Sequence, residues 1–223
     1  MRLIPQTVTI AAVVVAALWT QSPLAGASNV PPGRIVSLIP SDDEVSQYVG
    51  LQVRHDVDPL PARPWQPEPL SQRDDCRKLF ATNDVDAWGS DYSAFRTQTW
   101  TVPGDPTQIF VGQSVGIFAD AGSTRNRFDA AYNPNFFRSC DHAIMQGGPV
   151  PEGFSWELYD FKTNDDVMIW TIAARNWGEY TGYNCVAVAF RLGNVMSISS
   201  VGQMGNPSQA VKRLTDYILS RAI

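Results

Sequence analysis

Three stretches of this chain alternate apolar with polar residues, and no other pattern in the sequence limits the fold as strongly. They cover residues 107–118, residues 166–174, and residues 185–201 with Gly193-Asn194 near the middle. A two-residue period sends successive side chains to opposite faces, so each stretch predicts strands with one face in a core. In the first stretch, that face carries Ile109, Val111, Val115 and Ile117.

The predicted strands follow one another directly along the chain. Residues 154–161 are expected to pair with 166–174 around Thr163-Asn164-Asp165, and residues 185–190 with 195–201 around Gly193-Asn194. Strand–helix–strand units, which a parallel sheet needs, do not recur. The sequence therefore predicts an α+β fold in which an antiparallel β-sheet is flanked by α-helices.

Three helices are predicted from capping residues and apolar stripes. Ser41-Asp-Asp-Glu44 is a capping box that starts a short helix over 41–50, which Gly50 ends. A second helix covers 120–133 and is expected to end because of Pro134. The C-terminal helix has Asn206 as its cap, Pro207 at its first position, and an apolar stripe of Ala210, Val211, Leu214, Tyr217, Ile218 and Ala222.

The N-terminus has the pattern of a signal peptide. The apolar run of residues 8–19 follows a basic start and is too short to cross a bilayer, which takes about 20 residues. Ala25-Gly26-Ala27 matches a cleavage site, so residues 1–27 are predicted to be removed after Ala27; an uncleaved anchor is the alternative. Ala27 also stands where a lipoprotein needs its lipid-carrying Cys. We expect a secreted, extracytoplasmic cell-envelope protein with no stable membrane anchor after cleavage.

The rest of the chain divides by composition. Residues 28–40 contain Pro and Gly and are predicted to be an extended or disordered linker, and residues 41–223 a single domain. Within it, prolines at 59, 61, 64, 67 and 69 keep residues 58–70 extended. This proline-rich strap is expected to wrap across the domain with Trp65 packed in; the alternative is a recognition segment for a partner.

Charge and residue types exclude several kinds of ligand. Lys and Arg number 17 against 22 Asp and Glu, and they form no cluster that could neutralise nucleic-acid phosphates. The acidic groups at 42–44, 74–75 and 165–166 lack the spacing of a calcium loop, and two His and three Cys offer little for a transition metal. We predict no nucleic-acid partner, no metal and no cofactor.

The three cysteines are Cys76, Cys140 and Cys185, and an exported protein can pair two of them in three ways. Cys185 lies in an apolar run that predicts a buried strand, where a thiol is inert. We therefore favour a Cys76–Cys140 disulfide with Cys185 unpaired. Closing a loop of about 64 residues would stabilise the fold by roughly 4 kcal/mol in the chain-entropy model.

Residues 112–116 match the G-x-S-x-G nucleophile elbow, which makes a small secreted serine esterase using Ser114 and His142 an alternative function. That elbow is a sharp turn from strand to helix, whereas here the apolar alternation continues through Ser114 to Phe118. His142 also follows too soon for the units that deliver an acid and a base. Cys140 and His142 lie only two positions apart, and residues so close along a chain rarely face each other productively. We expect no catalytic residue.

Residues 174–184 link two predicted strands and carry Trp177, Tyr180 and Tyr183 among glycines. Exposed aromatic rings on such a loop can stack on sugars or apolar ligands. These three residues, with Trp170 on the preceding strand, are the candidate ligand-binding residues. The alternative is a hairpin end whose rings fold back on the sheet.

The chain resembles the extracellular sensor domain of PknH-type mycobacterial serine/threonine kinases, a domain that also occurs alone in exported proteins. The resemblance covers residues 41–223 and is clearest from Asp75 onward. It rests on the order and spacing of short motifs: residues 111–118, Ala121, Phe128, residues 137–140, residues 185–189, Arg191 and Asn194-Val195.

The resemblance implies an antiparallel sheet with helices and a solvent-exposed cleft for an unidentified envelope ligand: a small molecule, a lipid or a glycan. Cys76 and Cys140 match the first of the family's two usual disulfides, and Cys185 matches half of the second. Phe137 stands where the family often has Trp, and Ala187 where it often has Arg. We predict a non-enzymatic, sensor-like ligand-binding domain; a structural envelope protein acting through protein contacts is a further alternative.

Overall fold

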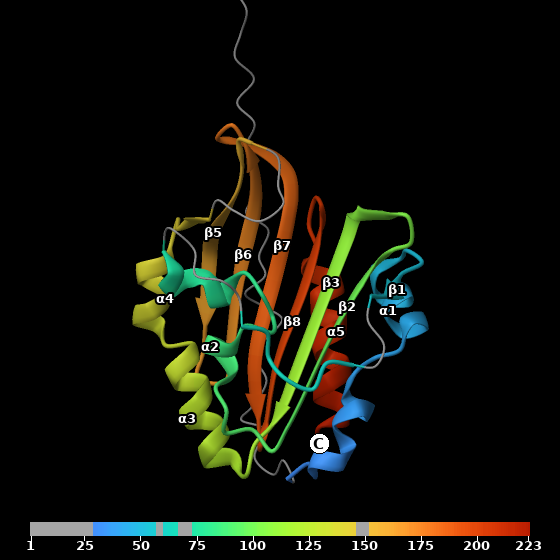
Figure 1. Ribbon diagram of the computed structural model, residues 1–223, viewed down its shortest axis with the longest axis vertical. Coiled ribbons are helices and arrows are strands. Elements are labelled where there is room, and N and C mark those ends of the chain that lie inside the picture. Colours follow the sequence, from blue (N-terminus) through green and yellow to red (C-terminus); the bar gives the residue numbers. More distant parts are fainter. Residues whose placement is uncertain (1–28, 57–59, 67–72, 146–151) are drawn as a thin grey trace, which may run out of the picture.

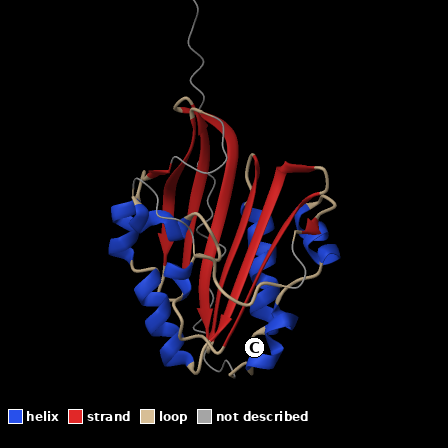
Figure 2. Cartoon of the chain, viewed as in Figure 1, coloured by secondary structure: helices blue, strands red, loops and turns tan. Residues whose placement is uncertain are grey.

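An eight-stranded antiparallel sheet forms the centre of the computed structural model, with strand order β1-β2-β3-β8-β7-β6-β5-β4. The structure describes residues 29–56, 60–66, 73–145 and 152–223. The expected signal peptide, residues 1–27, lies outside them. Figures 1 and 2 show the twisted sheet with helices beside it. The predicted α+β fold with an antiparallel sheet is confirmed.

Six long strands and two short ones make the sheet. The long strands are β2 (Ala94–Val102), β3 (Asp105–Ile117), β5 (Phe154–Thr163), β6 (Val167–Asn176), β7 (Glu179–Leu192) and β8 (Val195–Met204), and the short ones are β1 (Arg54–His55) and β4 (Ile144–Met145). Both predicted hairpins are present, because β5 pairs with β6 and β7 pairs with β8.

The sheet is buried on both faces, because strand residues alternate between two cores. On one face, Trp170 belongs to a core that three helices cover. They contribute Trp88 from α2 (Val85–Trp88), Phe128 from α3 (Ala121–Ala131) and Phe137 from α4 (Pro134–Cys140). On the other face, β3 residues pack against the C-terminal helix α5 (Ser208–Arg221). The predicted inner face of β3 is confirmed, since Ile109, Val111, Val115 and Ile117 are all buried there.

Helix α4 was missed because its start was interpreted as a stop. The helix predicted over 120–133 ends at Ala131, and Pro134 begins the separate helix α4. Asn133 caps α4 by accepting a hydrogen bond from the backbone N–H of Phe136 at 2.8 Å. Proline fits a first helical turn because its missing N–H has no partner there.

The C-terminal helix begins one residue later than predicted. Pro207 occupies the N-cap position of α5. Asn206 still caps the N-terminus of the helix, because its side chain accepts a 3.0 Å hydrogen bond from the Ser208 N–H. The short helix α1 (Asp42–Val49) agrees with the prediction. Its capping box joins Ser41 and Glu44, and Gly50 ends it in a left-handed conformation.

The N-terminal segment before α1 is folded onto the domain. Residues 28–40 were expected to be an extended or disordered linker, but Pro32–Leu38 forms the 3-10 helix η1. Val30, Ile35 and Leu38 are buried in the core beside α5, so burial of these apolar side chains fixes the segment. A second 3-10 helix, η2 (Asp74–Leu79), precedes α2.

The described part of the proline-rich strap, residues 60–66, follows the edge of the sheet. The Thr97 N–H donates to the carbonyl of Pro61, and Trp65 exchanges backbone hydrogen bonds with Asn83 and Val85. The expectation that Trp65 is packed in is wrong, because its side chain is 53% exposed. Backbone pairing holds the strap and leaves the ring outside. Among the described residues, no helix has the length and apolar character needed to cross a membrane.

Candidate ligand-binding surface

A buried carboxylate on β5 gathers three donors from different parts of the chain. The Glu157 side chain is only 6% exposed. Its Oε2 atom accepts from the Arg175 Nε at 2.5 Å and from the Tyr180 hydroxyl at 2.9 Å. Its Oε1 atom lies 2.7 Å from Nδ1 of His142. These four residues are called the Glu157 cluster below.

Strand register brings three members of the Glu157 cluster together. Ser155 on β5 pairs with Arg175 on β6, which places Arg175 diagonally from Glu157 on the same face. Arg175 pairs in turn with Tyr180 at the start of β7. His142 comes from the turn after α4, has a positive φ of 58°, and is fixed by its backbone N–H donating to Leu158.

Electrostatic interactions keep Glu157 and Arg175 of this cluster charged. Burial alone would raise the pKa of Glu157, but hydrogen bonds from His142, Arg175 and Tyr180 outweigh it and hold that pKa below its usual value. The hydrogen bond to Glu157 raises the pKa of His142. Burial and the neighbouring Glu157 raise the pKa of the Tyr180 phenol. The cluster therefore presents a neutral tyrosine and a cationic arginine on a fixed anion.

Two aromatic rings are exposed here, that of Tyr180 within the cluster and that of Trp177 at the neighbouring turn. The Arg175 guanidinium lies 3.9 Å from the centroid of the Tyr180 ring, whose side chain is exposed. Trp177 is 71% exposed at the β6–β7 turn. Its φ of 51° is a left-handed conformation that a bulky residue adopts rarely and at a cost in free energy. The turn thus holds a tryptophan in solvent at a position that glycine would fill more easily.

The four predicted ligand-binding aromatics do not share one site. Trp177 and Tyr180 are exposed on the hairpin, whereas Tyr183 packs edge-on against Trp156, with ring centroids 5.9 Å apart. Trp170 is 1% exposed and its indole N–H donates to the carbonyl of Leu79 in the core, so its ring lies apart from the exposed rings of the hairpin.

Ser114 is not placed as a nucleophile. It lies in the middle of β3, paired with Thr97 and Ile198 on the neighbouring strands. Its hydroxyl is buried and lies 2.7 Å from the Thr97 hydroxyl and 3.3 Å from the Thr82 hydroxyl. The strand interpretation of residues 112–116 is therefore confirmed. The His142 side chain contacts Glu157.

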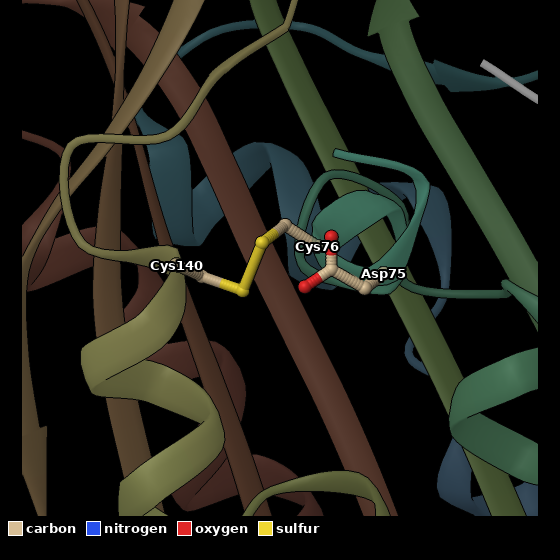
Figure 3. Close-up of side chains that lie close together, drawn as sticks. All are labelled: Asp75, Cys76 and Cys140. Atoms are coloured by element: carbon tan, nitrogen blue, oxygen red, sulfur yellow. A yellow bond between two sulfur atoms is a disulfide. The ribbon is translucent and has the colours of Figure 1, made fainter. Parts of the chain in front are cut away.

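The disulfide predicted between Cys76 and Cys140 is present (Figure 3). Asp75 lies close to both sulfur atoms. Since both sulfurs are in the disulfide, they are not thiolates, and this group lacks the ligands that a metal site built on it would need. Cys185 is free and buried, and burial raises the pKa of its thiol to about 12 despite a hydrogen bond from Ser200.

Sequence reasoning missed Glu157 and Arg175. They are 18 positions apart and meet only because β5 and β6 pair in one register. A partial signal was available: both lie in or beside segments expected to pair around Thr163-Asn164-Asp165. Counting back from that turn would not have paired them, because the register of the hairpin shifts between Tyr159 and Lys162.

Comparison with known proteins agrees with this fold. The model of the PknH-like extracellular domain family matches residues 30–221. The crystal structure of the extracellular domain of PknH from Mycobacterium tuberculosis matches with a TM-score of 0.74 and 16% identity, over 88% of this chain and 98% of that one. No curated protein sequence matches the chain. The chain therefore belongs to the PknH-like extracellular domain family, which implies an extracytoplasmic location.

Proposed function

We propose that this protein is a secreted, sensor-like domain that binds a ligand of the cell envelope at the β6–β7 hairpin and catalyses no reaction there. Family membership supports the sensor-like role. The observation that carries the binding proposal is the exposed Trp177 ring held in a left-handed backbone conformation beside the Glu157 cluster. Strain of this kind persists where the surrounding structure imposes it, and it is concentrated at functional sites.

The chemistry of the surface suits a ligand with both apolar and polar parts. Trp177 and Tyr180 offer ring faces, on which sugar rings or lipid chains can lie. Arg175 offers a guanidinium whose position is fixed by Glu157 and by stacking on Tyr180. Few rearrangements are needed when a ligand binds, because these side chains already hold one another in place.

A thermal-shift screen of the purified protein with envelope lipids and glycans tests the proposal. A ligand that binds only the folded state raises the melting temperature. Trp177→Gly should abolish this shift while preserving the fold, because glycine adopts the turn's backbone conformation without strain. Trp65→Ala removes an exposed ring elsewhere and serves as the matched control. A shift that survives Trp177→Gly contradicts the proposed surface.

A structural role through protein contacts is a second candidate. It is favoured by Trp65, whose exposed ring stands on the extended strap at the edge of the sheet. In that case Trp65→Ala would weaken capture of an envelope protein, and Trp177→Gly would not. The same two variants therefore separate the two functions.

A further inference from the structure

A cavity of about 560 Å³ lies at the other edge of the sheet from the Glu157 cluster. This α1 cavity is bounded by η1, α1, β1, β2 and α5, and its size is within the range of small-molecule sites, roughly 300–1,000 Å³. Its walls include Pro40, Asp42, Glu44, Arg54, Gln98 and Arg221.

Gln98 supplies an unsatisfied polar atom in this wall. The residue is 4% exposed, and its Nε2 donates to the carbonyl of Thr99 at 3.1 Å. Its Oε1 is buried and has no hydrogen-bond partner among the described residues. Leaving a buried acceptor without a donor is unfavourable, and such atoms in native proteins are usually satisfied by the protein, by water or by a ligand.

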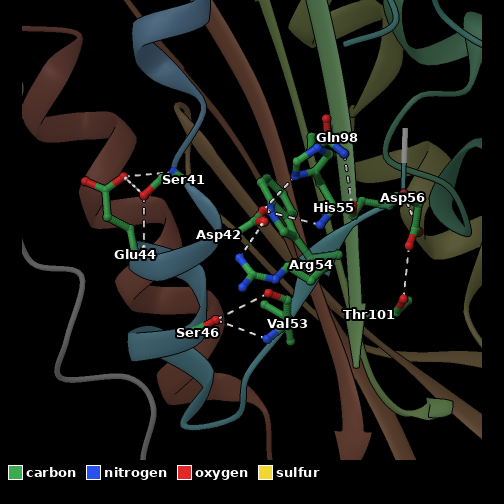
Figure 4. A network of polar contacts seen from close by, with 12 residues as sticks. Ser41, Asp42, Glu44, Ser46, Val53, Arg54, His55, Asp56, Gln98 and Thr101 are labelled. Atoms are coloured by element: carbon green, nitrogen blue, oxygen red, sulfur yellow. Dashed lines mark hydrogen bonds and ion pairs between the residues drawn. The ribbon is translucent and has the colours of Figure 1, made fainter. Parts of the chain in front are cut away.

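The charged groups of the α1 cavity already neutralise one another (Figure 4). Asp42 accepts from Nδ1 of His55 at 2.9 Å, from Arg54 at 3.3 Å and from the Trp100 indole N–H at 3.0 Å. Glu44 accepts from Arg221 at 3.3 Å. Partial burial opposes ionisation of Asp42, but these donors outweigh it and keep its pKa low. These groups are therefore largely balanced in charge, so the wall offers a strongly charged ligand little excess of opposite charge.

The same groups suit a ligand rich in hydroxyls. Arg54 donates to Asp42, and Arg221 donates to Ser37 and Glu44, each at 3.3 Å. Both side chains are well exposed and retain further N–H groups. Asp42 and Glu44 have further lone pairs, and Pro40, Leu60 and Tyr217 provide apolar surface for a ring. Donors, acceptors and an apolar wall in one concave site are what a neutral sugar needs.

We propose that the α1 cavity binds a neutral carbohydrate unit of mono- or disaccharide size, with a ligand hydroxyl donating to Oε1 of Gln98. Because this oxygen is covered, the ligand reaches it only when the partly exposed His55 ring, which lies near Gln98 (Figure 4), gives up its contact with Asp42. Arg54 and Arg221 donate to the outer hydroxyls. This site is independent of the β6–β7 surface, which lies on strands at the opposite end of the sheet order.

Titration of the purified protein with D-glucose, D-galactose and maltose tests this inference, read by Trp fluorescence and by the NMR signals of the His55 ring. At least one sugar should perturb His55, and Gln98→Leu should weaken its binding by about tenfold, the equivalent of one hydrogen bond. Gln98→Leu should not lower the melting temperature, because it removes an unsatisfied buried acceptor. Gln203→Leu, on β8 outside the cavity, is the matched control.

Several outcomes overturn the inference. They are no response of His55 to any of the three sugars at 100 mM, equal binding by Gln98→Leu, or tighter binding of glucose 6-phosphate than of glucose. Trp177→Gly should leave sugar binding here unchanged. Failure of the α1 cavity and failure of the hairpin surface are thus distinguished by separate variants.

Discussion

Nδ1 of His142 lies 2.7 Å from Oε1 of Glu157, and this contact ties the turn after α4 to strand β5. The chain's other histidine has the same arrangement, since His55 lies 2.9 Å from Asp42. In both places, an arginine and an aromatic donor also contact the carboxylate: Arg175 and Tyr180 at Glu157, and Arg54 and Trp100 at Asp42. Each histidine thus belongs to a network that fixes an anion at one edge of the sheet.

His142 should make stability depend on pH. Its pKa is raised in the folded state, so its stabilising contribution is complete below its unfolded pKa of about 6.5 and is lost as pH rises through the folded pKa. Thermal unfolding of the wild type and His142→Gln should therefore differ most near pH 5 and converge by pH 9. A difference that stays constant over this range would contradict ionic pairing with Glu157.

Glu157→Gln should destabilise the protein by about 1–3 kcal/mol. It leaves Arg175 beside a neutral amide and weakens the hydrogen bonds from His142 and Tyr180, and hydrogen bonds to charged groups are worth about that much. Urea unfolding measures the change. Glu179→Gln, an exposed change at the start of β7, should stay within about 0.5 kcal/mol. Equal effects of the two substitutions would show that burial of Glu157 is unimportant.

Replacing both Cys76 and Cys140 with alanine should lower the free energy of unfolding by about 4 kcal/mol. The disulfide joins residues 64 positions apart, and removing it restores the conformational freedom of that loop in the unfolded chain. Denaturant unfolding of the oxidised wild type and the double variant gives the difference. A loss below about 1 kcal/mol would mean that this loop is already restricted in the unfolded state.

Cys185 should resist alkylation in the folded protein. Its thiol is buried and its pKa is about 12, so very little thiolate is present at pH 8. Iodoacetamide followed by mass spectrometry should leave Cys185 unmodified in buffer and modify it fully in guanidinium chloride. Rapid labelling of the native protein would contradict a closed strand pair at β7 and β8.

Ser114 should be unreactive toward a fluorophosphonate probe. Its hydroxyl is buried, and among the described residues it contacts the hydroxyls of Thr97 and Thr82, neither of which is a general base. Ser114→Ala should cost about 1 kcal/mol of stability through that lost bond. Labelling of the wild type that disappears in Ser114→Ala would restore the esterase alternative.

The helix starts show how far local sequence reasoning reaches. Asn206-Pro207 correctly indicated a helix start, and Asn133-Pro134 has the same chemistry, yet Pro134 was interpreted as the end of the preceding helix. Both interpretations of proline are locally valid, since it ends one helix and favours the first turn of another. Only packing of Phe137 against Trp170 in the core favours the second helix at that point.

Alternation of apolar residues, turn residues and caps determined β3, the strands of both hairpins and the antiparallel fold class, because these depend on neighbours within a few residues, whereas β2 was not predicted. Spacing of the cysteines and the apolar surroundings of Cys185 favoured the disulfide. Strand register and burial decided the rest: they put Trp170 inside, left Trp65 outside, and joined Glu157 to Arg175 and Gln98 to the α1 cavity. Such contacts link residues far apart along the chain, and only the assembled sheet brings them within hydrogen-bonding distance.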